Sequence, residues 1–289
     1  MEQVPTLFVS STFLHLAKHD LEKASSIRGR WGRLATEGTE RRLEVDVALD
    51  FTDRTGWKYR LRNAHDASTD YSLEYLVNNK DFVVFKRICV GIDFFIVFPD
   101  SNGVRFGSKS LDGKLIAFMK TRLKDPVLNV YGKEKPEHAE SICKWFSMHH
   151  FERLRITFQP AYKQLLLSSL NTRVLTAINI NGEVPEEIAS QILSWAHRNV
   201  ETFTYILVSC TAVRFDLAFF KKVFERWYHQ GGFIGCIFMG HTSFNISELS
   251  HYRNAQQERR ELKWISPNHK KDTLFVGLKC GGAMYINAG

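Results

Sequence analysis

Cysteine and histidine are the most reactive side-chain types in this chain, and their spacing favours neither a metal site nor a catalytic nucleophile. The histidine pair His149 and His150 closes a predicted helix, and no further ligands stand at a suitable spacing. No two cysteines form a C-x-x-C pair, which argues against a zinc ribbon or a redox site. We expect buried, inert thiols, as in reduced proteins of the cytosol or nucleus; they are Cys89, Cys143, Cys210, Cys236 and Cys280.

The sequence contains no H-E-x-x-H, no Walker P-loop, no nucleophile elbow and no complete dinucleotide fingerprint. The glycine-rich segment 231–235 follows a predicted helix and leads into a strand, the reverse of a phosphate-binding loop, so we expect a helix cap and a turn. Trp145, Trp195 and Trp227 recur on predicted helices, where packing between helix and sheet is expected rather than stacking on a ligand. We therefore predict no enzyme activity, no cofactor and no metal.

The composition excludes a disordered chain, because 44% of the 289 residues are hydrophobic and 24% are charged. A net charge of +8 is modest, and the basic residues are dispersed, so no nucleic-acid partner is expected. The longest uncharged stretch, 231–247, contains four glycines and is a poor membrane span. With no recognisable secretory signal, we expect a protein of the cytoplasm or nucleus, without membrane contact.

The elements that must carry any function begin with a helical segment over residues 1–36, which the segment 37–39 is expected to end. Its apolar residues recur at steps of three to five, as on helix faces separated by short turns. Residues 43–51 and 57–62 then alternate between apolar and polar side chains, which predicts a β-hairpin with a half-buried first strand. A further strand pair is expected over 82–90 and 94–98.

From about residue 110, predicted helices and strands alternate. Four strands share the pattern apolar-x-x-apolar-x-apolar, beginning at Phe151, Leu175, Phe203 and Ile234. This pattern resembles the core of a leucine-rich repeat, although Gln159, Glu183, Thr211 and Thr242 replace the closing Asn or Cys. We predict an irregular leucine-rich-like array with parallel neighbouring strands, closed by residues 257–289 with a capping strand at 274–278. An ordinary α/β sheet with evenly spaced elements is the alternative.

The predicted fold class is α+β overall, with two domains. A small helical module covers residues 1–40. The βα repeat-like domain, preceded by the hairpin, covers residues 41–289.

Residues 4–35 resemble an F-box. Val4 and Pro5 form the opening apolar-proline pair, and Asp20-Leu21 forms the acidic-leucine pair fifteen residues after Pro5. The remaining family positions then match without a gap: Ile27, Arg30, Trp31, Leu34 and Ala35. The layout of about the first 90 residues is similar to that of a large nematode group of F-box proteins.

The resemblance implies that the helical module binds the Skp adaptor, which links to a cullin–RING ubiquitin ligase. The residues that would make or support this interface, some of them as the module's own core, are Pro5, Phe8, Phe13, Leu16, Leu21, Ile27 and Trp31. The chain would then be a non-enzymatic substrate-recognition adaptor of an SCF-type ligase.

An unknown substrate protein would bind the exposed face of the sheet. The strand positions outside the core pattern would form this face: Asn129, Arg153, Arg155, Asn179, Tyr205 and Phe238. Two other functions stay open: a leucine-rich-like interaction scaffold with no ligase link, for which residues 1–36 are only a helical cap, and an enzyme or nucleic-acid binder with an unrecognised site.

Overall fold

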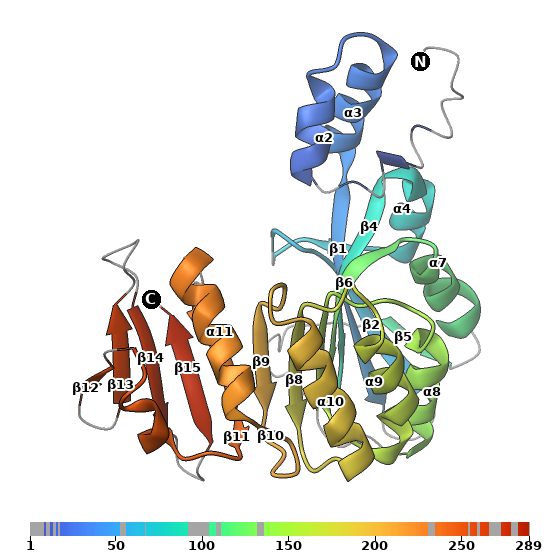
Figure 1. Ribbon diagram of the computed structural model, residues 1–289. Coiled ribbons are helices and arrows are strands. Elements are labelled where there is room, and N and C mark those ends of the chain that lie inside the picture. Colours follow the sequence, from blue (N-terminus) through green and yellow to red (C-terminus); the bar gives the residue numbers. More distant parts are fainter. Residues whose placement is uncertain are drawn as a thin grey trace. The chain divides into compact units, whose positions relative to one another are not determined.

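Helices and strands alternate along most of the chain in the computed structural model (Figure 1). The structure describes residues 9, 12–13, 16, 18–52, 56–66, 68–91, 104–107, 111–131, 136–230, 235–253, 255–258, 261–265, 273–278 and 283–288. The chain divides into two units, residues 1–132 and 133–289. The mixture of helices and strands confirms the predicted α+β class. The separate domain expected over residues 1–40 stays a prediction.

The first unit opens with two helices, α2 (Lys18–Ser25) and α3 (Arg30–Arg41). Its strands are β1 (Leu43–Thr52), β2 (Gly56–Asn63), β3 (Asp70–Tyr71), β4 (Val83–Val90), β5 (Val104–Gly107) and β6 (Leu123–Val130). The shorter helical segments are α4 (Leu73–Asn78), η1 (Lys80–Phe82), η2 (Leu111–Ile116) and α7 (Ala117–Lys120). The prediction that 37–39 ends the helix was wrong: α3 continues to Arg41, helped by an ion pair between Arg41 and Glu37 (2.7 Å).

The predicted hairpin is confirmed, because β1 and β2 pair antiparallel from Val45 opposite Asn63 to Thr52 opposite Gly56. On its other edge β1 pairs with β4, and β4 with β6, both in parallel. The strands β3 and β5 pair with the outer edge of β2. The second strand expected over 94–98 lies outside the described residues.

The strand β1 is buried on both faces rather than half-buried as predicted. Asp46 and Ala48, on the side expected to face solvent, are 4% and 1% exposed. Asp46 stands between Arg62 of β2 and Arg87 of β4, and its Oδ2 lies 3.7 Å from Arg87 Nη1. Its Oδ1 has no hydrogen-bond partner among the described residues. Desolvation by burial raises the pKa of Asp46, against the lowering effect of Arg87 and Arg62.

The second unit alternates strands and helices. Its helices are α8 (Pro136–Phe146), α9 (Lys163–Leu170), α10 (Glu186–Arg198) and α11 (Leu217–Gln230), with short turns η3 (Pro160–Tyr162) and η4 (Ile246–Leu249). Its strands are β7 (Arg153–Thr157), β8 (Ala177–Asn181), β9 (Tyr205–Val208), β10 (Arg214–Phe215), β11 (Gly235–Thr242), β12 (Gln256–Glu258), β13 (Glu261–Ile265), β14 (Thr273–Leu278) and β15 (Met284–Ala288).

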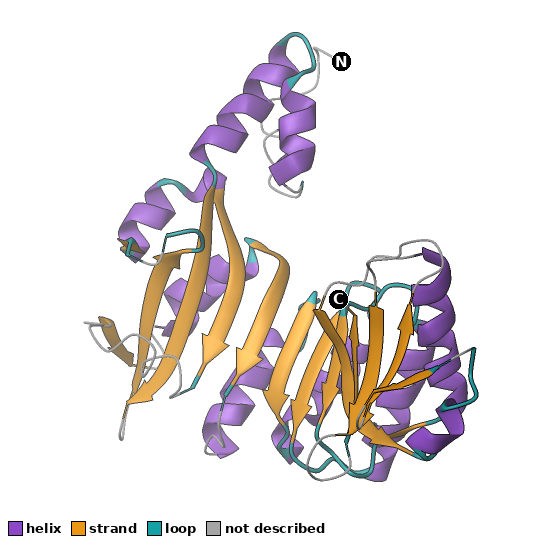
Figure 2. Ribbon diagram, turned by 90° about the vertical axis from the view of Figure 1, so that its left-hand side faces the viewer, coloured by secondary structure: helices purple, strands orange, loops and turns teal. Residues whose placement is uncertain are grey.

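Strands β7, β8, β9 and β11 lie side by side in parallel, in the order of the chain, as the alternation predicted. One face of these strands is apolar and fully buried, for example at Ile156, Ile180 and Val208. Figure 2 shows the helices of this unit gathered on one side of its strands. Trp195 and Trp227 are 0% and 1% exposed, which confirms their predicted packing role.

The sheet of the second unit ends in antiparallel strands rather than in further βα units. β15 pairs with β11, and β14, β13 and β12 follow in that order. The strand predicted at 274–278 is therefore confirmed as β14. Its buried Leu274 and Val276 share their side of the sheet with Trp264, whose ring lies 5.5 Å from that of Phe224 on α11. The same helix thus covers both parallel and antiparallel strands.

Replacing Asp46 with Asn tests the cost of its buried charge. A carboxyl whose folded pKa exceeds its unfolded value favours the folded state at low pH and loses that contribution as the pH rises through the folded pKa. Starting from about pH 4, the ordinary value, Asp46→Asn should therefore gain in unfolding free energy relative to wild type as the pH increases. Urea denaturation at a series of pH values measures this difference. Parallel curves for Asp46→Asn and wild type would contradict the prediction.

Candidate functional site

The helical module, defined here as the described residues from Val9 to Arg41, has a small apolar core of its own. Val9, Phe13, Leu21 and Ala35 are buried. The partly buried residues packed against this core are Leu16, Ala24, Trp31 and Leu34. The rings of Phe13 and Trp31 meet edge to face, with centroids 5.9 Å apart. Four of the seven residues predicted to make or support the Skp interface (Phe13, Leu16, Leu21 and Trp31) thus build the module itself.

Ile27 differs from these residues, because half of its surface is exposed (50%). It lies in the turn between α2 and α3, where the N-cap residue Gly29 adopts a positive φ of 89°. A shallow groove of about 390 Å³ begins beside Ile27 and continues along α3 past Thr36 to Glu40. The predicted interface residues Pro5 and Phe8 lie outside the described residues. Sequence periodicity did not separate Ile27 from the core residues.

A close approach at Gly32 fixes the turn between the two helices. A Cβ atom at Gly32 would overlap the backbone carbonyl of Ile27 and lie 3.0 Å from the carbonyl oxygen of Ser25. Gly38, six residues later on α3, has open space around it. Glycine is therefore required at the first position and only tolerated at the second.

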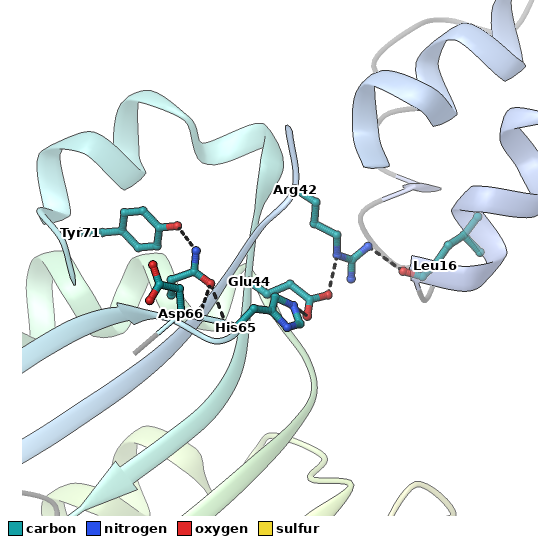
Figure 3. A network of polar contacts seen from close by, with 7 residues as sticks. Leu16, Arg42, Glu44, His65, Asp66 and Tyr71 are labelled. Carbon is teal, nitrogen blue, oxygen red and sulfur yellow. Dashed lines mark hydrogen bonds and ion pairs between the residues drawn. The ribbon is translucent and has the colours of Figure 1, made fainter. Parts of the chain in front are cut away.

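Two consecutive arginines, Arg41 and Arg42, anchor the module where α3 passes into β1. Figure 3 shows the contacts of Arg42. The Arg42 side chain is 5% exposed; its Nη1 donates to the carbonyl oxygen of Leu16 (2.9 Å) and its Nε to Glu44 Oε1 (2.9 Å). The other carboxylate oxygen of Glu44 lies 3.0 Å from His65 Nε2. The guanidinium of Arg41 stacks 3.8 Å from the centre of the Phe82 ring. These contacts join the module to strand β1 and to the turn before β4.

The parallel strands of the second unit present the opposite, uncovered face. Arg153 is exposed, and Arg155, Asn179 and Tyr205 are partly exposed on this side. Arg155 lies directly opposite Asn179, while Arg153 and Tyr205 flank Ala177 from the two neighbouring strands. Burial raises the pKa of Tyr205, and this effect outweighs the lowering of the pKa by the positive charges of Arg153 and Arg155. Four of the predicted substrate-binding residues therefore lie together.

The prediction that Phe238 stands on this exposed face was wrong. Phe238 is fully buried and opposes Ile206, on the helix-covered side. Its ring meets that of Phe215 at 4.7 Å. The register of β11 against β15 shifts between Cys236 and Phe238, and such an irregularity breaks the strict alternation that the sequence pattern assumes. Met239 takes the outward position instead.

Asn129, the sixth predicted residue of the substrate-binding face, belongs to the first unit, on β6. It is half-buried, and its Nδ2 lies 3.6 Å from the sulfur of Cys89, to which it donates.

Side chains after the parallel strands tie one βα loop to the next. Glu183 follows β8, and its carboxylate accepts from the Thr211 N–H (3.4 Å) and hydroxyl (3.2 Å) and from the thiol of Cys210 (3.2 Å). The Val184 N–H in turn donates to the sulfur of Cys210 (3.3 Å). Glu183 and Thr211 occupy positions where the repeat pattern lacks its usual closing residue. Cys210, which the sequence indicated only as an inert thiol, is the part of this network that sequence analysis missed.

The described residues contain no group of three or more His, Cys, Asp or Glu side chains placed to hold a metal ion. Burial raises the pKa of the Cys143 thiol to about 11, and its Sγ donates to the Ala161 carbonyl (2.9 Å). Burial also raises the pKa of Cys89. Both shifts disfavour the reactive thiolate.

Among the residues described, no helix is long and apolar enough to span a bilayer.

Comparison with known proteins adds no relative: no protein-family model matches the chain, and no curated protein matches it.

Replacing Gly32 with Ala should disrupt the helical module, because the added methyl group overlaps the backbone of the preceding turn. We expect a loss of about 1–3 kcal/mol, typical of overpacking, visible as easier proteolysis between residues 20 and 40. Gly38→Ala is the matched control and should stabilise the same helix by about 0.5–1 kcal/mol. Equal protection of both variants in a limited-proteolysis time course would show that the close approach at Gly32 is unimportant.

Proposed function

We propose that this protein is a substrate-recognition adaptor of an SCF-type ubiquitin ligase, acting in the cytoplasm or nucleus. In this proposal the helical module binds the Skp adaptor, which brings in the cullin–RING ligase. The uncovered sheet face of the second unit binds the protein to be ubiquitinated. The chain itself contributes binding and orientation and no chemistry.

The observation that supports this proposal most is a difference in burial among the residues predicted to make or support the Skp interface. Phe13, Leu21 and their neighbours pack into one core, whereas Ile27 is left half exposed beside a groove. The four buried residues described in this core are few for an independent unit. An exposed apolar side chain at the edge of such a module is the kind of group that a partner surface covers.

The substrate half of the proposal is supported by the composition of the uncovered face. Arginine and tyrosine are enriched among residues that dominate binding energies at protein interfaces. Arg153, Arg155 and Tyr205 stand on neighbouring strands of one rigid sheet, so their relative positions are set before a partner arrives. Preorganised side chains lose less entropy on binding than residues on mobile loops.

The first test is binding of the purified full chain to purified Skp adaptor. Ile27→Asp should weaken binding at least about tenfold, because a charge replaces an apolar contact in a desolvated interface. Met148→Asp is the control: Met148 is 87% exposed and lies outside the helical module, so this change should leave Skp binding intact. Surface plasmon resonance gives both dissociation constants. A folded wild-type chain that does not bind Skp would refute the ligase link.

The second test replaces Arg153, Arg155 and Tyr205 together with Ala. Quantitative mass spectrometry of proteins that co-purify from cells should show the loss of one set of partners while Skp is retained. The control removes two exposed charges from α11 (Lys221→Ala with Lys222→Ala) and should retain both. An unchanged partner set in the triple variant would contradict the assignment of this face. If the triple variant loses the partner set but the wild-type protein never retains Skp, the scaffold alternative is favoured instead.

A further inference from the structure

A pocket in the first unit lies outside both surfaces described above. It has a volume of about 590 Å³, within the range of small-molecule sites. Residues from three places in the chain line it: Tyr59 on β2, residues 71–74 and 77 where β3 passes into α4, and Lys114 in η2. All of these belong to the same unit, residues 1–132.

The floor of the pocket is Tyr59, on the apolar face of the sheet. Its side chain shares this face with Leu49 on the neighbouring strand, and the residue is only 5% exposed. Tyr59 is paired with Val104 of β5, whereas β3 begins its pairing with β2 at Leu61. The pocket thus lies at the point where the outer edge of β2 changes from one short partner strand to the other.

One wall of the pocket is held in place by two contacts. Asn63 Nδ2 donates to the hydroxyl of Tyr71 (2.8 Å), and the Tyr71 ring stacks on that of Tyr75 with centroids 5.6 Å apart and planes 10° apart. The Tyr75 N–H donates to Ser72 Oγ (3.0 Å), which fixes the start of α4. The wall is therefore formed before any ligand binds, which lowers the entropic cost of binding.

The rim combines apolar side chains with one positively charged and one negatively charged residue. Leu73 and Val77 line the pocket from α4, and Val77 is 44% exposed. Lys114 supplies an ammonium group and Glu74 a carboxylate. The hydroxyls of Ser72 and Tyr71 add further donors beside the ammonium, so most polar groups around the pocket can donate to an acceptor.

We propose that this pocket binds a small amphipathic carboxylate, with its apolar body over Tyr59 between Leu73 and Val77 and its carboxylate beside Lys114. The apolar lining supplies the affinity, and the lysine and hydroxyl donors determine the sign of the ligand's charge. The carboxylate of Glu74 repels the carboxylate of the ligand and so lowers the affinity. This site does not depend on the proposed ligase function.

The test uses decanoate as the probe with the full-length wild-type chain, in isothermal titration calorimetry at low ionic strength. We expect saturable binding at one site, and binding of decylammonium at least about threefold weaker, since an exposed charge contact contributes on the order of 1 kcal/mol. Lys114→Ala should weaken decanoate binding about threefold to tenfold, and Glu74→Gln should strengthen it. Val77→Asp should abolish it by placing a charge against the apolar body.

The opposite directions expected for Lys114→Ala and Glu74→Gln keep the test independent of folding, because a damaged fold would weaken both. Circular dichroism melting of Val77→Asp checks its fold separately. The proposal is overturned by the absence of saturable decanoate binding, by equal affinity for decylammonium, or by the same response of the two charge variants. Binding that survives in a folded Val77→Asp variant would place the probe elsewhere and overturn it as well.

Discussion

One constraint orders the second unit: the helices that the structure describes there cover one face of its parallel strands. The side chains of a strand alternate between faces, so Ile156, Ile180 and Val208 are buried beneath helices while Arg155 and Asn179 are left on the other side. Packing of α9, α10 and α11 therefore determines which residues are available for binding. The large buried rings, Trp195 and Trp227 among them, fill the space between these helices and the sheet.

In this one-sided arrangement, the loops after the parallel strands are stabilised by hydrogen bonds to one another. Backbone groups in such loops need partners where helix and sheet no longer supply them. Glu183 and Cys210 provide these partners between successive βα units. A carboxylate and a thiol here accept backbone N–H groups at the loops, near the place where a regular repeat has its closing Asn or Cys.

Alternation of apolar and polar residues was sufficient to predict the β1–β2 hairpin. The succession of strands and helices along the chain predicted the parallel order of β7, β8 and β9. Alternation failed at β11, where consecutive apolar residues leave both faces equally plausible and a register shift decides that Phe238 is buried. It also failed for Asp46, since the polar side of a central strand is covered by its neighbours' long side chains. Both failures arise from pairing, which a single segment does not encode.

The candidate sites show the same difference between what the local sequence pattern predicts and what only tertiary packing determines. The apolar spacing of residues 13–34 indicates that they form one helical module, but only the packing of α2 against α3 shows that Leu21 is inside and Ile27 outside. The pocket over Tyr59 had no sequence signal, because its lining comes from separate segments: residues 59, 71–74, 77 and 114. Separate segments converge there only through the strand order β1–β2–β3.

The strand β12, which ends the antiparallel part of the second unit, has only the three residues Gln256–Glu258. An outer strand with only three described residues displays few unpaired backbone groups. Another polypeptide chain therefore finds little backbone to extend the sheet by adding a strand at this end. A short edge strand of this kind disfavours self-association by strand addition, so recognition depends on side chains of the sheet face.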